Sequence, residues 1–304
     1  MTDVPAPPHP LAKAPFATAS AAPRRKPKGV VRRLVEHRLF MTGSILFALM
    51  LVMAITADLL ALYDPIVVRA RNRFRAPSLA HPFGTDNFGR DIFSRVVYGA
   101  RLSIQIGFVT VLLTAILGTA CGVAAGYFRR LDNLIMRVMD ALMAFPALLL
   151  AIAITAALGP SAFNVVVALA AVYTPRTARV VRASVLVVRE ADYVQAARAV
   201  GAGHLRIMIQ HILPNSLAPL IVQLTFVFAY AVIAEAVLSF LGMGPSPPTP
   251  SWGNIIAEGK DYIREASWIA LFPGLAIAIT VLGLNLLGDG LRDVLDPRMN
   301  VETR

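Results

Sequence analysis

The sequence predicts an all-α membrane protein with six transmembrane helices. The chain has 304 residues, of which 57% are hydrophobic and only 15% are charged, and its mean hydropathy is +0.64. Soluble domains average about 25% charged residues, so a chain this poor in charge needs lipid as part of its solvent. Six apolar runs are long enough to cross a bilayer, which takes about 20 helical residues.

The predicted spans follow these apolar runs in order. They cover residues 39–62, 102–127, 134–158, 162–181, 217–241 and 268–287. Residues 1–28 are rich in Pro and Ala and predict a disordered cytoplasmic tail. No small-residue cleavage site closes the first apolar run, so it is expected to stay as a span. Residues 29–304 are therefore predicted to form the transmembrane domain.

Six spans place both termini on one side, and the distribution of Lys and Arg predicts which side this is. With the termini inside the cell, inside segments hold about 20 Lys and Arg and outside segments about 9. The loop after the first span opposes this orientation, because residues 69–101 carry seven Arg outside. Long loops cross with weaker dependence on charge, so we expect both termini to be cytoplasmic.

An amphipathic stretch, EADYVQAARAVGAGHLRIMIQHILP at residues 190–214, separates the fourth and fifth spans. Its pattern predicts two short helices, the first with apolar residues at every third position and the second with spacing i, i+3, i+4, i+7. Gly201 and Gly203 stand between them, where a helix end favours a left-handed residue. Pro214 then begins the next span, where a proline costs little. The stretch predicts a bent helical hairpin on the inner face of the membrane.

Three roles fit such a hairpin. It resembles an interfacial helix that lies on lipid headgroups, a DNA-reading helix-turn-helix, or a docking element for a cytoplasmic partner. Membrane spans tether it at both ends and argue against entry into a DNA groove, so no nucleic-acid partner is expected. The small side chains of Ala196 and Ala197 favour docking, because they let another surface approach closely. Contact with lipid remains an alternative.

Five segments carry a resemblance to a known family. QAARAVGAGHLRIMIQHILP resembles the cytoplasmic-loop signature of ABC-importer permeases, which is Glu-Ala-Ala, three residues, Gly and a later Leu-Pro. The other four are HPFGTDNFGRDIFSRVVYGARLS, DALMAFPALLLA, EAVLSFLGMGPSPPTPSWGNIIAEGKDYI and LFPGLAIAITVLGLNLLGDGLRDVLDPR. Together they resemble the second, C-type permease subunit of dipeptide, oligopeptide and nickel importers. The resemblance implies the type I ABC importer permease fold.

The resemblance also implies what the hairpin contacts. In this family coupling helices, here at about residues 183–214, dock onto a cytoplasmic ATPase. The implied partners are a homologous second permease, two ATPase subunits and a periplasmic or surface-tethered substrate-binding protein. The residues implied for the ATPase-coupling loop are Glu190, Asp192, Tyr193, Gln195, Ala196, Ala197, Gly201, Ala202, Leu205 and Pro214. The sequence departs from the signature at Gln195, which replaces its acidic residue.

The chain itself is expected neither to hydrolyse ATP nor to hold a cofactor. Its nearest phosphate-loop-like segment, GNIIAEGKD at residues 253–261, has one residue too many between its glycines. Asp261 also stands where Ser or Thr would bind magnesium. ATP and magnesium are therefore expected on the partner subunits. Cys121 is the only cysteine, which excludes an internal disulfide and a cysteine metal cluster, and no metal site or catalytic residue is predicted.

Polar residues inside the predicted spans are candidates for the transport pathway. Asp140 and Glu235 fall within spans, where an ionised side chain costs about 2.5–3.5 kcal/mol and marks function by default. Asp140 is expected near the cytoplasmic end of its span, where the cost is small. Glu235 is expected either to line the cavity or to pair with a partner permease. Glu235 and Gln223 are the candidate pathway-lining residues.

Other patterns predict local geometry. Pro146 and Pro175 predict kinks in the third and fourth spans. Residues 118–126, GTACGVAAG, repeat glycine at every fourth position, the spacing of close helix–helix contact. Residues 86–91 predict the cap of a short helix before the second span.

The predicted function is a permease subunit in the bacterial inner membrane that imports di- or oligopeptides with the partners named above. Nickel chelates, glutathione and opines are alternatives on the same fold. A secondary transporter is less favoured, because the sequence shows no convincing repeat and few intramembrane charges. A membrane-anchored regulator that uses the hairpin as a binding module is the remaining alternative, and it would need no ATPase.

Overall fold

A computed structural model describes residues 29–295, which form a bundle of helices with no β-strand in that range. The predicted disordered tail, residues 1–28, lies outside the described residues. The helices are α1 (Val30–Glu36), α2 (Arg38–Ile55), α3 (Ala57–Leu60), α4 (Ile92–Tyr127), α5 (Arg129–Met143), α6 (Ala147–Leu158), α7 (Ala162–Val188), α8 (Asp192–Ala199), α9 (His204–Ile207), α10 (Leu213–Phe240), α11 (Trp252–Gly259) and α12 (Trp268–Leu295).

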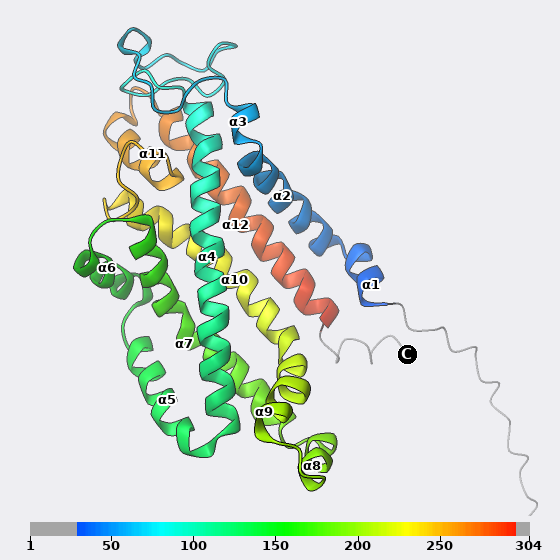
Figure 1. Cartoon of the computed structure of the whole chain (residues 1–304). Coiled ribbons are helices and arrows are strands. Elements are labelled where there is room, and N and C mark those ends of the chain that lie inside the picture. The colour runs from blue at the N-terminus through cyan, green and yellow to red at the C-terminus, as the bar shows by residue number, and fades with distance from the viewer. Residues whose placement is uncertain (1–28, 296–304) are drawn as a thin grey trace, which may run out of the picture.

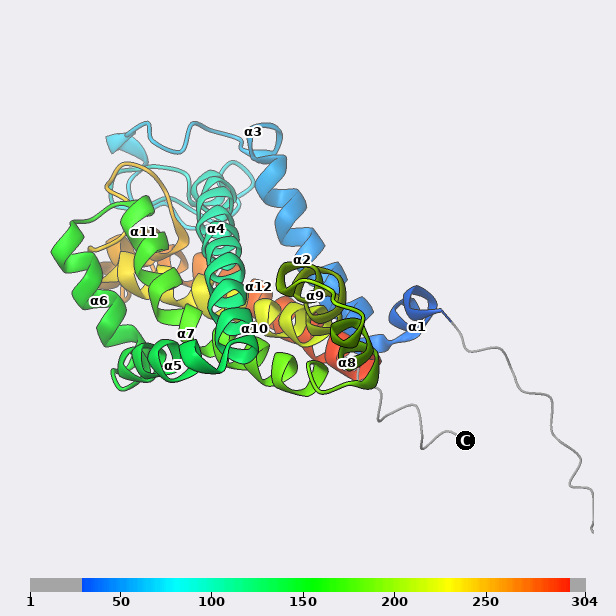
Figure 2. The ribbon, with the colours of Figure 1, turned by 60° about the horizontal axis from the view of Figure 1, so that its bottom comes forward.

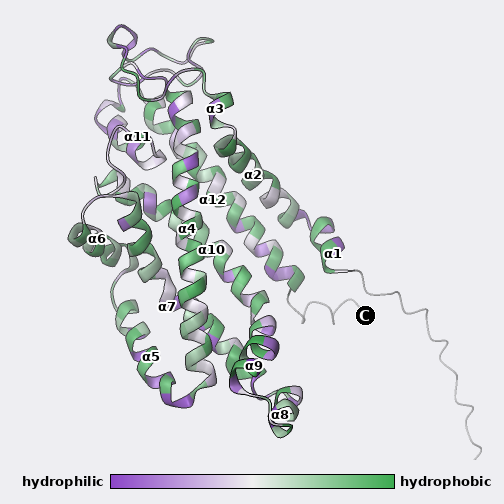
Figure 3. Cartoon of the chain, in the orientation of Figure 1, coloured by the Kyte–Doolittle hydropathy of each residue, from purple (hydrophilic) through white to green (hydrophobic). Residues whose placement is uncertain are grey.

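The bundle has two distinct ends, joined by long helices (Figure 1). One end carries α8 and α9, and the opposite end carries α11 and the long loop between α3 and α4. Both ends are richer in hydrophilic residues than the middle of the long helices (Figure 3). The start of α1 and the end of α12 both lie on the half of the molecule nearer α8, as two views show (Figures 1 and 2).

Four of the described helices are long and apolar enough to cross a membrane. They are α2, α4, α12 and a continuous helix of 37 residues, His204–Phe240, which runs through α9 and α10. A fifth span results if α5 and α6 count together as one broken span. The predicted all-α membrane fold is confirmed, whereas the predicted count of six spans is not fully reached.

The third predicted span, residues 134–158, is broken rather than straight. The axes of α5 and α6 meet at 91°, and Pro146 stands immediately before α6. A proline cannot donate the backbone hydrogen bond that would continue α5, and it restricts the residue before it. The kink predicted at Pro146 is therefore present, and it is sharp enough to separate two helices.

The fourth predicted span lies within α7, which has 27 residues but is less apolar than the others. Arg176, Arg179 and Arg182 lie on its second half. Two of these arginines pair with α5: Arg182 donates to both oxygens of Asp132 at 2.6 and 2.7 Å, and Arg179 donates to Asp140 at 2.6 Å. Composition alone therefore does not identify α7 as a span, and α5 and α7 share a charged layer.

Close packing of α4 against α7 explains the glycine repeat. A Cβ atom on Gly118, Gly122 or Gly126 would come within 2.6–2.7 Å of atoms of α7. Side chains larger than hydrogen would therefore push the two helices apart. The predicted role of this repeat in helix contact agrees with the structure.

Candidate functional site

The candidate site is the α8–α9 loop, which we define as residues 190–214. After α8, the backbone N–H groups of Gly201 and Ala202 donate to the carbonyls of Arg198 and Ala197 at 2.9 and 3.0 Å. This pair of bonds is the Schellman arrangement that ends many helices. Gly201 has φ of +82°, whereas Gly203 has φ of −66°. Only Gly201 therefore takes the left-handed conformation that the sequence suggested for the bend.

The second arm of the predicted hairpin is not a separate helix. It begins at His204 and continues without interruption into α10 through a π-helical turn, Met208–Ile212. Pro214 lies just after this turn, where its missing N–H and its ring disturb an ordinary α-helix. A π-turn lets the helix pass such a position, so the arm is rigidly continuous with α10.

The loop is anchored by an apolar inner face. Val194 and Ile212 are fully buried and Ile207 is 1% exposed. They belong to one cluster with Val181 and Val185 of α7. The buried side chains fix the orientation of α8 and α9 against the bundle.

The outer face of the loop is open. Tyr193 is 48% exposed, Leu205 67% and Val200 85%. Of the ten residues predicted for ATPase coupling, eight are exposed and two are half-buried. The half-buried residues are Ala197 and Ala202, and the exposed residues are Glu190, Asp192, Tyr193, Gln195, Ala196, Gly201, Leu205 and Pro214. Most of the predicted residues are therefore accessible, and exposed apolar side chains lie among them.

Three polar contacts tie the loop and the end of α7 to α4. The hydroxyl of Tyr127 and Nδ1 of His204 lie 2.8 Å apart in a hydrogen bond. The guanidinium of Arg198 lies over the Tyr127 ring at 5.4 Å, and Arg189 donates to the carbonyl of Gly126 at 2.7 Å. These links could not be predicted from the sequence, because they join residues that are distant in the chain.

Gln195 has a specific contact at the position where the signature carries an acid. Its Nε2 donates to the carbonyl of Arg189 at 3.2 Å, just after the end of α7. A carboxylate has no proton to donate there at neutral pH. Gln195 thus covers an exposed carbonyl that the acidic residue of the signature would leave without this partner.

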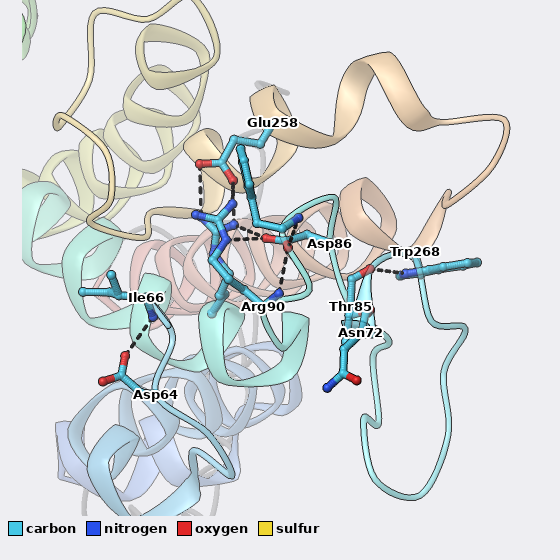
Figure 4. Close-up of polar contacts among 10 residues, drawn as sticks. Asp64, Ile66, Asn72, Thr85, Asp86, Arg90, Glu258 and Trp268 are labelled. Carbon is cyan, nitrogen blue, oxygen red and sulfur yellow. Dashed lines mark hydrogen bonds and ion pairs between the residues drawn. The ribbon is translucent and has the colours of Figure 1, made fainter. Parts of the chain in front are cut away.

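A second polar cluster lies at the opposite end of the bundle. Asp86 accepts from Arg90 Nε at 2.6 Å and from Arg95 Nη1 at 2.7 Å. Glu258 of α11 accepts from Arg95 Nη1 at 2.6 Å and also from Arg90 (Figure 4). Arg95 is 1% exposed and Asp86 is fully buried. Two positive and two negative charges balance, and they join α4 and the preceding loop to α11.

The predicted cap at residues 86–91 forms part of the same region. Asp91 accepts a hydrogen bond from the backbone of Ser94 at 2.8 Å and so begins α4. The indole of Trp268 donates to the carbonyl of Thr85 at 3.0 Å (Figure 4). Arg95 and Glu258 are not among the predicted site residues. A basic residue within the largely apolar start of α4 was the available signal that a buried acid must face it.

The two candidate pathway residues lie in different surroundings. Glu235 is fully buried inside the chain, and its two oxygens accept from Ser103 at 2.9 Å and Ser239 at 2.7 Å. Gln223 is half-buried and lines an open cavity of about 590 Å³ between α7, α10 and α12. The structure therefore does not bring these two side chains together.

Asp140 and Asp132 both lie on α5. Asp140 is exposed, and its partner Arg179 is exposed as well. Asp132 accepts hydrogen bonds from Arg182 on both of its oxygens. Both acids therefore pair with arginines of α7, which gives Asp140 a structural contact.

Two family models match this sequence. The binding-protein-dependent transport system inner membrane component matches residues 115–301, more than half of the chain. The chain belongs to this family. The N-terminal TM domain of oligopeptide transport permease C matches residues 28–82 of the same permease. The predicted family is thereby confirmed from both halves of the sequence.

Several relatives share most of the length of this permease. A Brucella abortus protein provisionally named a peptide transport system permease is 58% identical over 271 residues, which cover 89% of this chain and 92% of the relative. The dipeptide transport system permease protein DppC of Alkalihalophilus pseudofirmus is 47% identical, over 88% of each chain. The glutathione transport system permease protein GsiD of Escherichia coli is 42% identical, over 88% of this chain and 89% of that protein.

A solved structure supports the fold. A chain of the MetNI methionine ABC transporter in an inward-facing conformation superposes with a TM-score of 0.53 at 20% identity. The match covers 66% of this permease and 97% of the MetNI chain. The family match, rather than this superposition, identifies this permease as a membrane component of a transport system.

Proposed function

We propose that this permease forms half of the translocation pathway of an ATP-driven importer of di- or oligopeptides. The names of the Brucella and Alkalihalophilus relatives support a peptide substrate. The importer would be completed by a homologous second permease, two cytoplasmic ATPase subunits and a substrate-binding protein. Nickel chelates, glutathione and opines are the alternative substrates. Among these, the name of one relative supports glutathione.

The exposed outer face of the α8–α9 loop is the observation that supports ATPase docking best. Apolar side chains exposed together at one end of a protein commonly mark an interaction surface. Its exposed apolar side chains include Tyr193, Val200 and Leu205, and the buried side chains beneath hold the loop in one orientation. The loop therefore offers a preformed surface onto which a partner can dock.

The loop is also built to transmit force. ATP can change the permease only through contacts that differ between two states, so the docked element must move the spans with it. The second arm of the loop is continuous with α10, and the bond between His204 and Tyr127 reaches α4. Movement of the loop would therefore displace two long helices directly.

The orientation that follows places the α8–α9 end and both termini in the cytoplasm. Reporter fusions test it: fusions after Arg75 and Lys260 should report outside, and fusions after His204 and Arg292 inside. An inside report after Arg75 would show that the arginine-rich loop stays in the cytoplasm and that the first span is misplaced.

Two experiments test the function itself. The purified single chain should not hydrolyse ATP, and activity should require co-purified ATPase and second permease subunits. A deletion strain should lose uptake of labelled di- and oligopeptides and regain it with the gene. Uptake of glutathione or nickel in place of peptides would select an alternative, and hydrolysis by the single chain would reject the division of labour.

A further inference from the structure

An open cavity with both polar and apolar lining residues lies between α7, α10 and α12 and has no assigned ligand. Its volume is about 590 Å³, within the range of roughly 300–1,000 Å³ that small-molecule sites occupy. The four most polar side chains that line it are Arg176, Asn215, Gln223 and Arg292. It lies towards the α8–α9 half, because it includes the first turns of α10 and the last turns of α12. Figure 2 shows these helices from that end.

Among residues 29–295, no acidic side chain pairs with Arg176, and in this it differs from the other two arginines of α7. Arg179 pairs with Asp140, and Arg182 pairs with Asp132. Within residues 29–295, the contact made by Arg176 is with an aromatic ring, its guanidinium lying 6.0 Å from the centroid of Tyr230.

Arg292 shares this condition, since no carboxylate in the described part of the chain pairs with it. A charged side chain on a membrane helix normally faces a partner or a water-filled cavity. The described lining of this cavity therefore contains two arginines and no carboxylate.

The chemistry of the lining specifies an anionic ligand with further polar groups. Guanidinium groups bind carboxylates through paired N–H donors, and the amides of Gln223 and Asn215 can donate to or accept from a peptide group. The alternative ligand is one acidic side chain from a helix of a partner subunit. Such a side chain would need only one guanidinium and no amide groups to bind it. We propose that Arg176 and Arg292 receive the free carboxylate of the transported peptide during its passage, with Gln223 beside its amide groups.

This inference rests on the proposed peptide-import function and deepens it. A pathway site must bind well enough to draw the substrate in and weakly enough to release it. Two exposed, solvated arginines suit such a site. Their charge lowers the cost of moving a carboxylate away from bulk water, and their solvation keeps the binding weak.

The test uses the complete transporter in proteoliposomes, with the variants Arg176→Gln and Arg292→Gln. Arg179→Gln is the matched control. It removes the same charge from α7 one turn along the helix, but Arg179 pairs with Asp140 and does not line the cavity. Uptake of a labelled dipeptide, normalised to ATP hydrolysed, should fall about tenfold in each cavity variant, the value of one charged hydrogen bond. Arg176→Lys should recover part of the loss, and the control should stay near wild type.

A second measurement compares the dipeptide with its C-terminal amide, using a pair that the binding protein retains equally. The preference for the free carboxylate should disappear in Arg176→Gln. Unchanged transport per ATP in both cavity variants would overturn the inference. A second result would also overturn it: the cavity variants lose the co-purified second permease, and transport of the dipeptide and of its amide falls equally. That result would assign the arginines to a contact between subunits. Failure of the wild type to transport any peptide would instead reject the proposed function, and this inference with it.

Discussion

Substitution of Gly201 tests whether backbone geometry shapes the docking surface. Its φ of +82° lies in the left-handed region, and a Cβ atom there would meet no heavy atom of the described chain within 4 Å. The Cβ atom of a substituted residue therefore meets no steric clash inside the described chain. Its cost comes from the backbone, about 1–2 kcal/mol for a residue with a Cβ atom. This cost is greatest for β-branched residues and small for Asn, which tolerates the left-handed region.

The loss of ATP-driven uptake should therefore increase along the series Gly201→Asn, Gly201→Ala and Gly201→Val. A cost of one to two kcal/mol shifts the population of the docking conformation by about 5–30-fold, so Gly201→Val should lose ATP-driven uptake and ATPase co-purification. Gly201→Asn should keep most of both. The assay compares the variants in matched membrane preparations, with the amount of inserted permease measured in each. Equal damage from Asn and Val would refute the backbone argument and assign the defect to side-chain bulk against the partner.

Three further outcomes are expected. Gln195→Glu exchanges one exposed amide donor for a charge, which changes the free energy of docking by about 0–1 kcal/mol, so uptake should remain mostly intact. A loss of uptake as large as that of Gly201→Val would show that charge governs docking. Glu258→Gln removes one of the two carboxylates that pair with the buried Arg95 and leaves it Asp86, which should lower the free energy of unfolding by about 1–3 kcal/mol. The measurement is thiol-dye labelling of the single cysteine during thermal unfolding in detergent, and an unchanged midpoint would contradict the expectation. Tyr127→Phe removes the bond to His204, so peptide transported per ATP should fall while insertion stays normal, and an unchanged ratio would show that this contact carries no coupling.

The sequence predicted the helical membrane fold because apolar runs of sufficient length have few other stable states in lipid. It also located the bend of the loop, since a glycine between two amphipathic repeats indicates a left-handed helix end. The glycine repeat of α4 was readable for a similar reason, because its spacing follows from helix geometry alone.

The span count was less readable from composition. Residues 134–158 and 162–181 look continuous when only hydropathy is counted, yet Pro146 divides the first into two helices at 91°. The arginines of α7 make the second range, residues 162–181, too polar to be assigned as a membrane span from composition alone. The acidic partners of Arg179 and Arg182 are on α5, 39 and 50 residues away, and hydropathy carries no information about such pairs.

What the sequence by itself determined was therefore local: the helices, their breaks, the left-handed glycine and the accessible loop motif. What only the tertiary structure decided was which distant charges meet. Asp86, Arg90 and Arg95 neutralise one another together with Glu258, whereas Arg176 faces a cavity. Helix and turn preferences act over a few residues, but charge compensation depends on three-dimensional distance, which the order of residues along the chain does not specify.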